Sequence, residues 1–173
     1  MKNLTLSIMP SYKCNFKCQY CYLGNLIQSD NLLSLENLES SLLELKQLYN
    51  IKNVSLYGGE LSLLDNVYLQ RLADLIKLQL PKSSISLTSN FSNENILTFC
   101  LLNNIKLNVS LNEERYQYSK TLQQIKEYTG TKLFDLTVVV LPSIINRPIN
   151  ELYKFYNKLG FDVFFIQHYN SVY

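Results

Sequence analysis

Apolar and polar positions along this chain follow two periods. Short runs rich in β-branched and aliphatic residues recur along the sequence, and the longer segments between them have the apolar spacing of amphipathic helices. This pattern predicts six strands, at residues 4–8, 54–57, 85–88, 107–111, 136–141 and 163–166. Strands that alternate with helices are typical of βα units around a parallel sheet.

Two of the intervening segments carry one apolar stripe each, as expected for helices that cover a sheet. The stripes are Leu35, Leu38, Leu42, Leu45 and Leu48, and Leu69, Leu72 and Ile76. Asn93 is placed to cap a third helix, which has Ile96, Leu97 and Cys100 on its apolar face. A fourth helix, ending near Gly160, has the apolar face Ile149, Leu152, Tyr153 and Tyr156. Residues 113–128 are more polar and predict an exposed helix.

These elements predict an α/β fold, specifically an open, partial TIM-type (βα)6 barrel, because six strands fall short of the eight that close a full barrel. A chain of 173 residues is long enough to bury one ordinary core. No low-complexity linker or shift in composition marks a boundary within it. We therefore expect residues 1–173 to form a single domain.

The charge pattern indicates neither a nucleic-acid partner nor a membrane surface. Sixteen Lys and Arg against fourteen Asp and Glu give a net charge of +2, and no run of like charge concentrates it. The first ten residues lack the apolar core of a signal peptide, and no apolar run approaches the roughly 20 residues of a membrane span. Three of the four cysteines lie within eight residues, a poor layout for a disulfide framework. A reducing cytoplasm is the expected location.

The three neighbouring cysteines, Cys14, Cys18 and Cys21, have the spacing CxxxCxxC and follow the first predicted strand. A loop can wrap three thiolates around a cubane cluster, which leaves one of its four irons without a protein ligand. A zinc site is the alternative interpretation. Structural zinc normally has four protein ligands, however, and the only histidine, His168, lies at the far end of the sequence. The spacing therefore favours a 4Fe-4S cluster.

With Tyr20 before its last cysteine, this motif resembles that of the radical S-adenosylmethionine (SAM) superfamily, CxxxCxΦC, in which Φ is aromatic. The tripeptide Gly58-Gly59-Glu60 after the second strand is similar to the GGE motif of the same family, although Leu61 stands where a proline is usual. The resemblance implies that SAM chelates the open iron through its amino and carboxylate groups. It also implies that the backbone of Tyr20 approaches the adenine and that the GGE motif contacts the methionine amino group.

Polar residues at the ends of the later strands are weaker candidates. The carboxyl ends of parallel strands lie at one edge of the sheet, where sites occur in such folds. The resemblance implies that side chains at these ends surround SAM, and the candidates are Ser89, Asn90, Ser110, Asn112, Arg115 and Gln167. Ordinary turn and cap residues are the alternative interpretation. Cys100 is predicted to be a small buried hydrophobe of a helix.

The resemblance implies a radical SAM enzyme. One electron from a flavodoxin- or ferredoxin-type donor enters the cluster, and SAM is cleaved to a 5′-deoxyadenosyl radical that abstracts hydrogen from a substrate. The string CNFKCQYCY followed by GGE is similar to members that modify peptides or proteins, so such a substrate is expected. These members often carry a cysteine-rich C-terminal extension, which this sequence lacks. A minimal enzyme, a glycyl-radical enzyme activase and a core domain cut from a longer chain therefore stay open, as does a non-catalytic Fe-S or zinc interaction module.

Overall fold

A computed structural model describes residues 1–111, 134–140, 147–157 and 163–167 of the chain. Six parallel strands form one sheet in sequential order, with β1 and β6 at its edges. The strands are β1 Lys2–Ile8, β2 Tyr49–Leu56, β3 Ser84–Ser89, β4 Lys106–Leu111, β5 Phe134–Val140 and β6 Val163–Gln167. The six predicted strands and the α/β class are confirmed, and β2 extends furthest beyond its predicted start.

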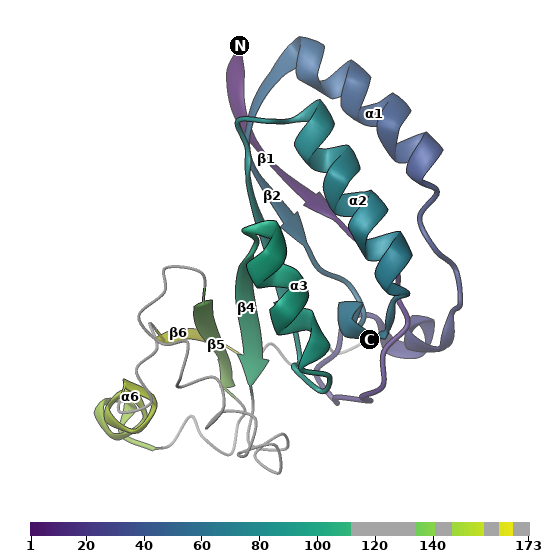
Figure 1. The fold of residues 1–173 in the computed structure, drawn as a ribbon. Helices are drawn as coiled ribbons and strands as arrows, with labels where there is room; N and C mark the ends of the chain where they lie inside the picture. Colours follow the sequence, from purple (N-terminus) through teal and green to yellow (C-terminus); the bar gives the residue numbers. More distant parts are fainter. Residues whose placement is uncertain (112–133, 141–146, 158–162, 168–173) are drawn as a thin grey trace.

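Three helices cover one face of this sheet, and the arrowheads of β1, β2 and β4 point to the same end of the molecule (Figure 1). The helices are α1 Leu35–Leu48, α2 Asn66–Gln79 and α3 Asn95–Asn103. A further helix, α6 Ile149–Asn157, lies near β5 and β6, at the β6 edge of the sheet (Figure 1). Two short 3-10 helices, η1 Gly24–Gln28 and η2 Leu61–Leu63, follow β1 and β2. No helix in the described ranges has the length and apolarity needed to cross a bilayer.

The core lies between the sheet and the helices, as the apolar periods predict. Leu42 of α1 and Leu72 and Ile76 of α2 are fully buried, and they belong to the same apolar cluster as Leu87 and Leu107 of the sheet. Each such side chain contributes roughly 1.5–3 kcal/mol by leaving water. Because side chains alternate along a strand, every second residue points to the opposite face of the sheet.

The opposite face of β3 and β4 is polar. Ser86 and Thr88 alternate with buried residues along β3, and Asn108 and Ser110 do the same along β4. None of these four side chains is fully buried. Thr88 and Ser110 stand nearest the carboxyl ends of their strands, so this polar face continues into the loops at that end of the sheet.

Several details of the predicted helices are wrong. Leu48 is 64% exposed, because α1 ends at this residue and the chain turns there into β2. Glu94 rather than Asn93 precedes the first residue of α3, and the Asn93 side chain accepts from the N–H of Asn95 at 3.1 Å. On α6, Ile149 and Tyr153 point to solvent instead of covering the sheet, with 61% and 51% exposure. The predicted helix at residues 113–128 and the predicted helix end at Gly160 lie outside the described residues.

Candidate active site

The three neighbouring cysteines lie in the loop that follows β1. We call residues 14–21 the cysteine loop. Its first residue donates its backbone N–H to the carbonyl of Ile27 at 3.0 Å, and Cys21 donates to the carbonyl of Cys18 at 3.0 Å. Backbone hydrogen bonds therefore hold both ends of the loop. None of its three cysteines lies in a helix or a strand.

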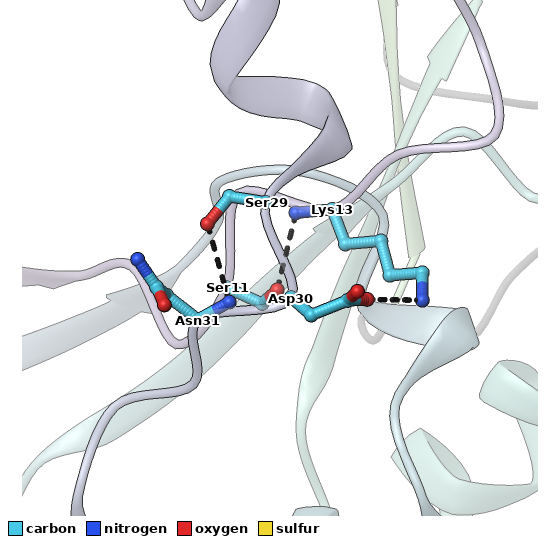
Figure 2. A network of polar contacts seen from close by, with 5 residues as sticks. All are labelled: Ser11, Lys13, Ser29, Asp30 and Asn31. Atoms are coloured by element: carbon cyan, nitrogen blue, oxygen red, sulfur yellow. Dashed lines mark hydrogen bonds and ion pairs between the residues drawn. The ribbon is translucent and has the colours of Figure 1, made fainter.

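Polar contacts fix the segments on either side of this loop (Figure 2). The hydroxyl of Ser11 accepts from the N–H of Lys13 at 3.1 Å, and the Lys13 ammonium pairs with Asp30. Ser11 also forms a β-bridge with Leu32. The ion pair is exposed on both sides and contributes little, because water screens it. The backbone bonds therefore do most to hold the base of the loop against the chain that leads to α1.

The carboxyl ends of β1, β2, β3 and β4 surround one cavity, of about 190 Å³. This is several times the roughly 30 Å³ that a water molecule occupies in the liquid. Ten of the sequence-predicted site residues line it, namely Cys14, Cys18, Tyr20, Cys21, Gly58, Gly59, Glu60, Ser89, Asn90 and Ser110. The fold thus brings together the two motifs and the polar strand ends that the sequence separates.

The other predicted site residues have no described side chain. Asn112 and Arg115 lie outside the described residues, and Gln167 is placed only as the last residue of β6. Four further described residues line the cavity, namely Phe16, Tyr22, Tyr57 and Thr88, and Thr88 directly precedes the predicted strand-end residues Ser89 and Asn90. The position of Tyr57 and Thr88 at the carboxyl ends of predicted strands was the available signal for these two.

The two glycines of the Gly-Gly-Glu turn, residues 58–60, bring this turn against the base of the cysteine loop. Gly59 donates its N–H to the carbonyl of Ser11 at 2.9 Å, and Glu60 donates to that of Lys13 at 2.8 Å. A Cβ atom on Gly58, whose φ is +141°, would lie 2.5 Å from the Ser11 oxygen, and one on Gly59 would overlap the carbonyl of Lys13. Close approach of two backbones, which only glycine permits, therefore joins the two motifs.

The carboxylate of Glu60 is buried, with 2% exposure, and it accepts three hydrogen bonds from residues that the structure describes. Oε1 accepts from the Ser62 N–H at 2.9 Å and from the Ser89 hydroxyl at 2.6 Å. Oε2 accepts from the Asn90 N–H at 2.6 Å. An ionised carboxylate has about four acceptor positions, so the three bonds from described residues leave one position, on Oε2. Leu61, in the place of the usual proline, is fully buried and anchors the turn by packing.

The position demands a carboxylate rather than an amide. The two backbone N–H groups, of Ser62 and Asn90, meet different oxygens of Glu60. A glutamine has one oxygen and one NH₂ group, so it would leave one of these buried N–H groups facing another donor. A buried donor without an acceptor is costly. Glu60 therefore ties the carboxyl ends of β2 and β3 together.

None of the four cysteines forms a disulfide, and they lie in two different environments. The pKa of the Cys14 thiol is raised, mainly by burial. The N–H of Phe16 donates to the Cys14 sulfur at 3.4 Å and lowers this pKa, whereas the nearby Glu60 carboxylate raises it. A bound metal must therefore displace a proton there. Cys100 lies apart, on α3, with 1% exposure, and burial raises its pKa to about 12. Its predicted packing role agrees with this burial.

The three thiols of the cysteine loop fit a cubane cluster. In the part of the chain that the structure describes, no three Cys, His, Asp or Glu side chains surround one point where a metal ion could bind. A cubane cluster needs no such point, because its thiolates bind different irons. The three thiols of the cysteine loop line one cavity and supply soft donors to it.

A family model for the Radical SAM superfamily matches residues 8–150. The chain belongs to this superfamily. The match spans the cysteine loop and the Gly-Gly-Glu turn, and it confirms the predicted family. The superfamily is a class of enzymes, and its cofactors are a 4Fe-4S cluster and SAM. The match therefore also confirms the predicted cofactors and enzyme class.

Proteins of similar sequence and fold include a sulfatase-maturating enzyme and two proteins that were solved with a bound peptide. A cysteine-type anaerobic sulfatase-maturating enzyme from Clostridium novyi is 24% identical over 93% of this chain and 50% of its own length. The structure of anSMEcpe with bound AdoMet and the Cp18Cys peptide is similar with a TM-score of 0.74 and 24% identity, over 96% of this chain and 51% of that one. SuiB from Streptococcus suis, bound to its precursor peptide SuiA, has a TM-score of 0.72 and 18% identity, over 97% and 40%.

These solved structures confirm the partial barrel that the strand count predicts. At identities below 25%, their similarity to this chain concerns the fold alone. The chain spans about half the length of the curated relative and of anSMEcpe.

Proposed function

We propose that this chain is a radical SAM domain that modifies a peptide or protein. In this proposal Cys14, Cys18 and Cys21 hold three irons of a 4Fe-4S cluster, and SAM binds the fourth. The observation that carries the proposal is one cavity, lined by all three thiols and by the buried Glu60 carboxylate at the carboxyl ends of the strands. An anionic acceptor beside a thiol set is what a ligand with an ammonium group and an iron-chelating end requires.

The remaining residues of the cavity are assigned to SAM by their position. The free acceptor position of Glu60 receives a hydrogen bond from the methionine ammonium, and the backbone of Tyr20 lies against the adenine. Ser89, Asn90 and Ser110 contact the ribose and methionine portions of SAM. Asn112, Arg115 and Gln167 complete the proposed set on the strength of the sequence resemblance.

The cluster and SAM, when bound, supply the one-electron chemistry that removes a hydrogen atom from a substrate. The chain holds the thiols, orients the methionine end of SAM through the Gly-Gly-Glu turn, and excludes water from the cavity. The electron donor is proposed to be a flavodoxin or ferredoxin. Four free thiols support a reducing compartment, and we propose the cytoplasm.

The peptide substrate is supported by the solved structures that this fold resembles. One of them holds the Cp18Cys peptide and another the precursor peptide SuiA, and a relative by sequence is named for the maturation of sulfatases. We also propose that residues 1–173 form a single domain, because one apolar cluster runs from α1 to β5.

Anaerobic reconstitution of the chain with iron and sulfide tests the proposal. The reconstituted protein should bind about four irons and four sulfides. With dithionite as reductant and SAM present, it should release 5′-deoxyadenosine, and protein without iron is the matched control. A protein that takes up the cluster but neither binds nor cleaves SAM would support the non-catalytic module instead. A protein that binds stoichiometric zinc and cannot take up iron would overturn the cluster.

A further inference from the structure

A side chain inside the cysteine motif makes its hydrogen bonds with the loop after β3. Asn15, the residue after Cys14, accepts with Oδ1 from the side-chain amide of Asn90 at 2.9 Å. Its own amide donates to the hydroxyl of Ser92 at 2.8 Å. The two partners follow Asn15 by 75 and 77 positions in the sequence. Asn15 does not line the cavity, so a contact with SAM does not account for it.

Asn90 connects this contact to Glu60. Its backbone N–H donates to Oε2 of Glu60 at 2.6 Å, while its side-chain oxygen accepts from the N–H of Ser92 at 2.9 Å. Asn90 is buried, with 8% exposure, so its amide has no easy replacement partner in water. The next residue, Phe91, is buried in a left-handed conformation with φ of +58°, and it donates its N–H to Ser89. The loop after β3 is thus held in one conformation on both sides of Asn90.

A continuous chain of hydrogen bonds therefore runs from the cysteine loop through Asn15 and Asn90 to the carboxylate of Glu60. On the proposed function, SAM must reach an iron held by the cysteine loop and an acceptor on Glu60 at the same time. The distance between these two anchors then decides whether both contacts form. Hydrogen bonds that exist before the cofactors bind lower the cost of ordering the site.

We infer that Asn15 is a positioning residue which, through its hydrogen bond with Asn90, fixes the cysteine loop relative to Glu60. An asparagine suits both places because its side chain is a donor and an acceptor in one planar group. This inference rests on the proposed function for its effect on SAM, whereas the tie between the two loops belongs to the chain without any cofactor.

Asn15→Ala and Asn90→Ala, singly and together, test the inference. Asn50→Ala is the matched control, because Asn50 makes the same kind of bond, with Asn3 at 2.9 Å, at the opposite end of the sheet. In metal-free protein, alkylation of the three thiols of the cysteine loop should be about three to ten times faster in Asn15→Ala. This is the range expected for the loss of the part-buried hydrogen bond with Asn90, since the second bond that the variant loses, with Ser92, is exposed to water. In reconstituted protein, iron content should be unchanged, and the dissociation constant for SAM should rise by a similar factor.

The double variant separates a chain of contacts from two independent effects. Most of the effect of Asn15→Ala on alkylation and on SAM affinity should disappear when Asn90 is already alanine. SAM affinity is measured from the change that SAM produces in the electron paramagnetic resonance spectrum of the reduced cluster. Unchanged alkylation rates in Asn15→Ala, or additive effects in the double variant, would overturn the inference. If the parent protein gives no SAM-dependent spectrum, the proposed function fails, and the alkylation rates still decide whether the two loops are tied.

Discussion

The two ends of the sheet carry similar polar residues in different surroundings. At the amino ends, Asn50 donates to Asn3 at 2.9 Å and Ser84 donates to Asn53 at 2.6 Å, and these pairs are exposed and join neighbouring strands. At the carboxyl ends, the buried carboxylate of Glu60 accepts three hydrogen bonds, and side-chain bonds join loops that are distant in sequence.

This difference shows that burial and charge, rather than the presence of Asn and Ser, distinguish the site. Water can replace a partner in an exposed pair at little cost, so such pairs tolerate substitution. A buried carboxylate with three donors has no such substitute, and removing it leaves the donors unpaired. Substitutions of equal chemistry should therefore have large effects at the carboxyl ends and small effects at the amino ends.

The largest expected effect comes from the thiols themselves. Cys18→Ala should reduce 5′-deoxyadenosine production to background and lower the iron content far below that of the parent. Two remaining thiolates cannot anchor three irons and leave the fourth for SAM. Iron and sulfide analysis after reconstitution, together with a SAM cleavage assay, measures both. Cys100→Ala is the control with the same chemical change, and loss of the cluster in that variant but not in Cys18→Ala would contradict the assignment.

The next largest effect, on the free energy of unfolding, is expected where the Gly-Gly-Glu turn contacts the base of the cysteine loop. Gly59→Ala should lower the free energy of unfolding by about 2–3 kcal/mol, because its Cβ overlaps the Lys13 carbonyl and the backbones must separate. Urea unfolding of the metal-free protein measures this change. Gly24 has a φ of +50° and no atom near its missing Cβ, so Gly24→Asn should cost less than about 1 kcal/mol. Equal costs for the two variants would mean that the close contact is not tight.

Glu60→Gln should lower the free energy of unfolding by about 1–2 kcal/mol, because one buried N–H group loses its acceptor. It should also weaken SAM binding about ten- to a hundredfold, as expected for a charged hydrogen bond, with the cluster retained. Urea unfolding and the SAM-dependent spectrum measure the two effects separately. Glu39→Gln is the control, since Glu39 accepts one bond, from Gln79 at 3.1 Å, between α1 and α2. Unchanged SAM affinity in Glu60→Gln would remove Glu60 from the proposed site.

The sequence predicted those parts of the molecule that depend on local period and spacing. The six strands, the buried stripe of α2 and the two motifs follow from residues close together in the chain. The three partners of Glu60 and the bonds of Asn15 depend on loops that only the folded sheet brings together, so no local pattern could predict them. The exposure of Ile149 and Tyr153 has the same origin, because an apolar helix face shows that a helix is amphipathic but not what it faces.

The smallest effect concerns Cys100. The experiment tests whether this buried thiol on α3 reacts differently from the three thiols of the cysteine loop. Burial raises the pKa of Cys100 to about 12, so at pH 8 only on the order of one molecule in ten thousand carries the reactive thiolate. Iodoacetamide should therefore label the three thiols of the cysteine loop in metal-free protein and label Cys100 only in urea, as mass spectrometry would show.

The raised pKa of Cys100 also sets the direction in which stability changes with pH. The folded state favours the neutral thiol, so its contribution is intact below the unfolded value of about 8.5 and falls as the pH rises towards 12. Cys100→Ala should cost about 1 kcal/mol at neutral pH and remove this alkaline loss. Rapid labelling of a fourth thiol in the folded protein would show that α3 opens, and the contrast between the two classes of cysteine would then fail.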